Sequence, residues 1–155
     1  MGGGIRNYLS CEADFDSEGG WIGDLPNENQ PPGLDLIEFL QSAIRPHTQS
    51  VSDVWNEEGY GWSFNCEKDR TTVNVLVQFV DHWLIICHIV SFVPRFLRSQ
   101  RFDIALKSAC DELDRAARAD ARFRDLRWFT ATEYADFEKK RHQKSKSQRH
   151  PRTNR

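Results

Sequence analysis

The stretch that decides the fold reads TVNVLVQFV over Thr72–Val80, then Asp81-His82, then WLIICHIVSF over Trp83–Phe92. In the first segment valine and phenylalanine recur at every second position, which is the period of a β-strand. The second segment is almost wholly apolar. Because the connection between them is short, the two segments are predicted to form an antiparallel hairpin. Their apolar residues on both faces predict a central place in a sheet, with a helical layer over the second face.

A third strand is predicted directly before this hairpin. Between Trp55 and Cys66, aromatic residues and a cysteine alternate with Gly, Ser and Asn, which is typical of a half-buried strand. The three strands together are expected to form a meander. In the first 33 residues, which are rich in Gly, Pro, Asn and acids, only Ile5–Cys11 has the composition of a short strand.

Helical spacing appears on both sides of the meander. Apolar residues at intervals of three and four predict helices over Leu34–Arg45, ended by Pro46, and over Phe102–Ala119. A strand is expected over Phe123–Phe129. The sequence TATE that follows is a capping box and predicts a last helix over Ala131–Arg141.

These elements predict an α+β domain: an antiparallel β-meander plus one further strand, with two or three helices packed on the sheet. The predicted organisation is a loop-rich acidic segment over 1–33, a single α+β domain over 34–141 and a disordered basic tail over 142–155. The element order from Leu34 to Arg141 resembles that of type III secretion chaperones, and the size suits small bacterial immunity proteins.

The charge of the chain is unevenly distributed. Residues 1–138 hold all 23 acidic residues and 13 of the 21 Lys and Arg, a formal charge of −10, whereas residues 139–155 hold 8 bases and no acid. A tail with almost no apolar residue cannot offset the entropy of ordering, which predicts disorder. Its basic residues are candidates for binding nucleic acid or an acidic protein surface. They are Lys139, Lys140, Arg141, Lys144, Lys146, Arg149 and Arg152.

The cysteines and the hydropathy indicate a cytoplasmic protein. The four cysteines lie singly, with no C-x-x-C pair, which favours free thiols in a reducing compartment. The longest apolar run, Val73–Val93, is interrupted by six polar residues, so we expect no membrane span and no membrane partner. The first 16 residues show no secretory signal pattern.

Motifs for chemistry are weak. The acidic stretch Asp14–Gly20 starts like a calcium loop, but its twelfth position is Leu25, so a turn is favoured. Cys87-His88 looks like a nucleophile beside a base, yet neighbouring residues of a strand point to opposite faces. The spacing of the five histidines supplies no metal site. We therefore predict no catalytic residue, no metal and no cofactor.

Two further groups of residues are candidates for binding. Trp55, Glu57 and Glu58 form a cluster of acids beside an aromatic residue, which is either a binding surface or a solvated turn. The arginines 95, 98 and 101 suit carboxylate or phosphate recognition, or neutralise the acidic body.

The sequence favours a non-catalytic protein-binding module of the adaptor, chaperone or immunity type. A nucleic-acid-associated protein that uses its basic tail is the first alternative, and an enzyme whose site assembles only in three dimensions is the second. The sequence leaves the oligomeric state and the identity of the partner open.

Overall fold

The computed structural model describes residues 4–17, 21–22, 25–26 and 30–149. The fold is α+β, with an antiparallel seven-stranded sheet and three helices. The strand order is β4-β6-β7-β8-β1-β9, and β5 also pairs with β6. The strands of this sheet are β1 Tyr8–Ala13, β4 Ser50–Val51, β5 Trp55–Asn56, β6 Trp62–Lys68, β7 Thr71–Phe79, β8 Trp83–Ile89 and β9 Phe123–Phe129. A separate small ribbon pairs β2 (Trp21–Ile22) with β3 (Leu25–Pro26).

The predicted meander is confirmed in β6, β7 and β8, which pair in antiparallel order. The register places Val75 between Phe64 of β6 and Cys87 of β8. All three side chains are fully buried, because alternate residues of each strand face the same side of the sheet. The two-residue period in the sequence therefore identifies the core face correctly.

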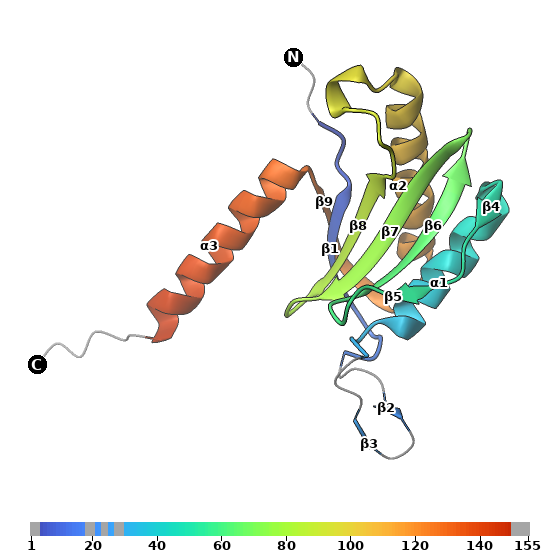
Figure 1. Cartoon of the computed structure of the whole chain (residues 1–155). Coiled ribbons are helices and arrows are strands. Elements are labelled where there is room, and N and C mark those ends of the chain that lie inside the picture. The colour runs from blue at the N-terminus through green and yellow to red at the C-terminus, as the bar shows by residue number, and fades with distance from the viewer. Residues whose placement is uncertain (1–3, 18–20, 23–24, 27–29, 150–155) are drawn as a thin grey trace, which may run out of the picture.

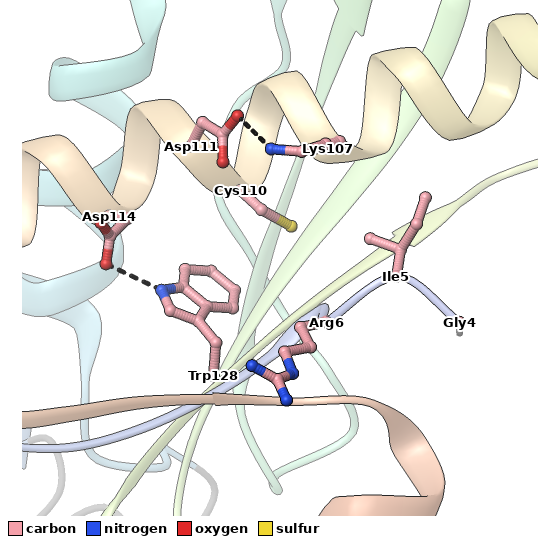
Figure 2. A pocket seen from close by; sticks show the side chains of 8 residues that line it. All are labelled: Gly4, Ile5, Arg6, Lys107, Cys110, Asp111, Asp114 and Trp128. Atoms are coloured by element: carbon pink, nitrogen blue, oxygen red, sulfur yellow. Dashed lines mark hydrogen bonds and ion pairs between the residues drawn. The ribbon is translucent and has the colours of Figure 1, made fainter. Parts of the chain in front are cut away.

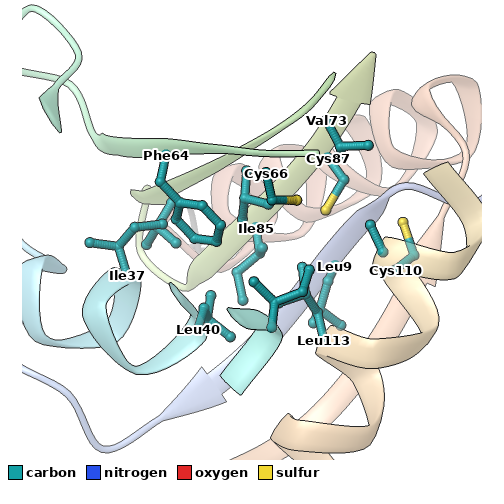
Figure 3. Close-up of a cluster of buried hydrophobic side chains, with 14 of the residues drawn as sticks. Leu9, Ile37, Leu40, Phe64, Cys66, Val73, Ile85, Cys87, Cys110 and Leu113 are labelled. Atoms are coloured by element: carbon teal, nitrogen blue, oxygen red, sulfur yellow. The ribbon is translucent and has the colours of Figure 1, made fainter. Parts of the chain in front are cut away.

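Two helices cover this face. The apolar stripe of α1 (Leu34–Ile44) and that of α2 (Gln100–Ala119) both lie against the sheet and pack against each other. Figure 3 shows Ile37 and Leu40 of α1 and Leu113 of α2 pointing toward the side chains of the sheet, with Ile37 next to Phe64. The core is thus a single layer of side chains between the sheet and a helix pair.

The N-terminal part of the chain corrects the predicted domain boundary. The strand β1 lies inside the sheet, between β8 and β9, rather than in a loop-rich segment outside a domain that begins at residue 34. Leu9 and Cys11 point into the core and are buried, and this burial is the reason that β1 belongs to the domain. The turn predicted around Glu18–Gly20 lies outside the described residues.

The C-terminal part corrects a second boundary. Helix α3 spans Ala131–Arg149, so residues 142–149, which were predicted to be disordered, are helical. Lys, Arg, Gln and Glu are good helix formers, and the packed first turns of α3 supply the nucleus that a polar helix lacks on its own. Residues 150–155 of the predicted tail lie outside the described residues.

The capping box that begins α3 is confirmed. The Glu133 N–H donates to Thr130 Oγ1 at 3.2 Å, and the Thr130 N–H donates to the Glu133 carboxylate at 2.8 Å. The first turns of α3 reach the second face of the sheet, where the Tyr134 ring stacks on Tyr8 with ring centroids 5.5 Å apart. From there α3 projects away from the sheet (Figure 1). Among the described helices, none combines the length and the apolar character of a membrane span.

Candidate protein-binding surface

The connection between β8 and α2 presents apolar side chains to solvent. Phe92 is fully exposed, and Phe96 and Leu97 are 85% and 65% exposed. Ile104, on the first turns of α2, is 55% exposed. We call this surface the apolar rim, which consists of Val90, Phe92, Val93, Phe96, Leu97 and Ile104. Contiguous exposed apolar side chains mark interaction surfaces more often than single ones do.

The backbone of the rim is held by its own hydrogen bonds. Pro94 ends the extended chain, and Arg95–Leu97 forms one 3-10 turn in which the Leu97 N–H donates to the Pro94 carbonyl at 2.8 Å. The Arg98 Nε–H donates to the Val93 carbonyl at 3.2 Å. The side chains of the rim are therefore exposed on a locally bonded loop (the projecting loop before α2 in Figure 1).

The rim is positively charged within an acidic body. The segment from Val90 to Ile104 contains three arginines and one acidic residue, Asp103. The Arg101 guanidinium lies over the Phe102 ring, 5.5 Å from its centroid, which is a cation–π geometry. Arginine and exposed phenylalanine together are typical of protein-binding surfaces.

A groove of about 700 Å³ lies directly beside the rim. Its walls come from the segment that leads into β1, the end of β8, the start of α2 and the start of α3. The residues that line it include Tyr8, His88, Arg98, Phe102 and Thr130. The walls are mixed in character: Ile5, Ile89 and Leu106 are apolar, while Asn7, Asp103 and Thr132 add polar groups to those named above.

A second cavity of about 470 Å³ adjoins the groove, and the two share Gly4 and Ile5 in their lining. Figure 2 shows how α2 forms one wall of it: Lys107 pairs with Asp111 at 2.8 Å, and Asp114 accepts a hydrogen bond from Trp128 Nε1 at 2.8 Å. Because these polar groups already bond to each other, the cavity is less suited to recognise a partner than the groove.

His88 is an exposed titratable side chain in the lining of the groove. Partial burial lowers its pKa, since the charged imidazolium is less well solvated there, and the nearby Arg98 lowers it further while Glu57 opposes the shift. Cys87 points to the opposite face, into the core, where the hydrogen bond with the Cys110 thiol and burial raise its pKa. The separation of Cys87 from His88 that strand geometry predicts is thereby confirmed.

The two groups of binding residues predicted from sequence lie in different places. Lys139, Lys140, Arg141, Lys144, Lys146 and Arg149 are all on α3, and Arg152 lies outside the described residues. Trp55 belongs to β5 and donates from Nε1 to the Glu57 carboxylate at 2.7 Å, while Glu58 occupies the adjoining turn with φ 48°. Four strands separate β5 from β9, which leads into α3, so the sheet does not bring the two groups together.

Sequence reasoning missed the apolar rim. Phe92 was assigned to a buried strand, but β8 ends at Ile89. One signal was available: Pro94 breaks the apolar run, and arginine follows at three-residue intervals, which is unusual for a core segment. Within the part of the chain that the structure describes, no three His, Cys, Asp or Glu side chains form a group that would hold a metal ion.

Comparisons with models of protein families, with curated proteins and with solved structures find no match to this chain. The resemblance in element order to type III secretion chaperones and immunity proteins therefore stays a prediction.

Proposed function

We propose that this protein is a non-catalytic protein-binding module of the adaptor, chaperone or immunity type, and that the apolar rim with its groove is the binding surface. The observation that carries the proposal is the exposure of Phe92 and Phe96 beside arginines on a hydrogen-bonded loop. Burying one large apolar side chain contributes about 1.5 to 3 kcal/mol. Two phenylalanines that enter pockets of a partner would thus supply much of the free energy of a micromolar complex.

The chemistry of the rim defines the kind of partner. Arg98 and Arg101 match carboxylates, and the phenylalanines and leucine of the rim match an apolar pocket or ridge. The partner is therefore a protein segment in which acidic residues flank apolar ones. Residues 1–138 carry a formal charge of −10, so most of the body would repel an acidic segment. The positive charge of the rim therefore also directs the approach of the partner to this surface.

The four cysteines support a cytoplasmic setting for this function. All four are free and buried, and burial raises the pKa of Cys66 to about 11 and that of Cys11 to about 12. Buried thiols of this kind are stable in a reducing compartment and contribute to the core as small apolar groups.

The test compares two double variants in cells of the source organism. Phe92→Ser with Phe96→Ser removes the apolar part of the rim, and Tyr60→Ser with Val80→Ser removes exposed apolar side chains elsewhere. Each tagged protein is crosslinked and captured, and the partner is then quantified. We expect the wild type and the control variant to recover the same partner at near-equal stoichiometry and the rim variant to recover at least tenfold less.

Equal recovery by the rim variant would place the binding surface elsewhere. If the wild type is captured from cells that express it at its normal level and no stoichiometric partner comes with it, the binding function itself is contradicted. The recovered partner is then truncated to the segment that binds, and that segment is expected to contain acidic residues beside apolar ones.

A further inference from the structure

The second half of α3 is a basic surface that the proposed function does not use. We define the basic helix as residues Lys139–Arg149, which contain six Lys and Arg and no acidic residue. The side chains from His142 to Gln148 are exposed along its whole circumference. Figure 1 shows this half of α3 projecting from the body.

The first half of α3 fixes the direction of the basic helix. The Phe137 ring stacks on Phe129 with centroids 4.9 Å apart, and Tyr134 stacks on Tyr8. Arg141 pairs with Asp81 in the turn between β7 and β8 at 3.0 Å. These contacts tie α3 to strands at two points, so the helix beyond them has a defined orientation relative to the sheet.

Four lysines of the basic helix have no ion-pair partner within the described residues, whereas its Arg141 pairs with Asp81 and with Glu138. Lys139, Lys140, Lys144 and Lys146 are exposed and make no hydrogen bond or ion pair there, although basic residues elsewhere on the body do. Lys140 and Lys144 are four apart, and like charges at this spacing destabilise a helix. The basic helix has no apolar face to bury, so an anion bound along it would relieve this repulsion.

The composition of the basic helix selects among anionic partners. It has no apolar residue to enter a lipid surface, and apart from the imidazole of His142 it has no aromatic residue on which the bases of a single strand would stack. The major groove of B-form DNA is about 12 Å wide and admits an α-helix, whereas that of A-form RNA is too narrow. Duplex DNA is therefore the polyanion that fits.

The arrangement of the lysines matches the two walls of a groove. At about 100° per residue, Lys139 and Lys146 share one side of the helix, and Lys140 and Lys144 share another about 130° away. The basic helix is about 16 Å long, which exceeds the Debye length of about 8 Å at physiological salt. Repulsion between DNA and the acidic body is therefore largely screened at the outer turns.

From these observations we infer that the basic helix binds duplex DNA by lying in the major groove, with Lys139, Lys140, Lys144 and Lys146 contacting phosphates on both walls. This binding is independent of the apolar rim, so one molecule would hold a protein partner and DNA at different surfaces.

The test measures binding of the full-length protein to a fluorescein-labelled DNA duplex of 20 base pairs, by anisotropy, between 50 and 200 mM NaCl. Four phosphate contacts predict a slope of about −3.6 in log K against log salt, or about a 100-fold loss of affinity over this range. The variant K140Q/K144Q/K146Q should reduce the slope to about −1. The control K107Q/R115Q/R118Q removes three positive charges from α2 and should leave the slope unchanged, as should the double rim variant.

Several outcomes would overturn the inference. They are an unchanged slope in the α3 variant, no binding of the wild type at 50 mM NaCl, or affinity for an RNA duplex, a DNA single strand or polyglutamate equal to that for the DNA duplex. Glutamine retains helix propensity, and far-UV circular dichroism of the variant verifies that α3 is intact. If the wild type binds DNA as expected but no protein partner is captured, the proposed function is refuted and the inference about DNA is not.

Discussion

Two phenylalanines in opposite environments give a direct test of the division between core and binding surface. Phe64 on β6 is fully buried between the sheet and α1, whereas Phe96 in the rim is 85% exposed. We compare Phe64→Ala with Phe96→Ala. Because the same side chain is removed in both variants, the effect on the unfolded chain is similar. The difference between their free energies of unfolding therefore reflects how the two phenylalanines are packed in the folded protein.

The magnitudes follow from burial. Truncating a fully buried phenylalanine removes its transfer free energy and leaves a cavity, and this costs about 3 to 5 kcal/mol. Phe96 has about one-seventh of its surface buried, so its truncation should cost less than about 0.5 kcal/mol. For a domain whose total stability is about 5 to 15 kcal/mol, the first variant is strongly destabilised and the second is not.

The assay is equilibrium unfolding in urea at pH 7, monitored by tryptophan fluorescence and by circular dichroism, with the m-value fitted for each variant. The reasoning requires the midpoint for Phe64→Ala to fall far below that of the wild type and the midpoint for Phe96→Ala to coincide with it. A loss above about 1 kcal/mol for Phe96→Ala would show that the rim is part of the folded core. The rim would then no longer be a candidate binding surface.

Three other predictions concern particular contacts. Thr130→Ala removes the side-chain cap of α3 and should cost about 1 kcal/mol in urea unfolding, while Thr132→Ala, an exposed neighbour, should have no measurable effect. Partial burial lowers the pKa of His88 below 6.5, so the imidazole binds a proton more readily in the unfolded chain than in the folded one. The free energy of unfolding should therefore fall as the pH decreases below about 6.5. The variant His88→Asn should show a smaller fall between pH 7 and 5. Gly61→Ala would place a Cβ against the Val77 carbonyl oxygen and should cost about 1 to 3 kcal/mol in thermal or urea unfolding. A midpoint equal to that of the wild type would show that β6 and β7 separate there easily.

The elements that sequence reasoning identified are those whose partners lie next to them in the chain. The hairpin of β7 and β8 and the helix α2 follow from local periodicity, and β9 was predicted with the bounds that the structure has. The position of β1 did not follow, because its neighbours in the sheet are Trp83–Ile86 and Phe123–Phe129, far along the chain, and a short strand carries no signal of its distant partners.

The errors at the C-terminus and at the rim have a common cause. Both predictions infer order or burial of a segment from its own composition. Order and burial also depend on which other elements pack against the segment. Residues 142–149 are polar, yet they continue a helix that is anchored at Tyr134 and Phe137. Phe92 is apolar, yet no strand or helix of the described chain covers it, because β8 ends three residues earlier.

The position of β1 also affects the folding of the chain during synthesis. The ribosome makes β1 first, but one of its partners, β9, is complete only after Phe129. At translation rates of about 5 to 20 residues per second, β1 waits on the order of ten seconds for that partner. During this time at least one edge of β1 is unpaired and exposed to water, so pairing with another chain competes with pairing to β9.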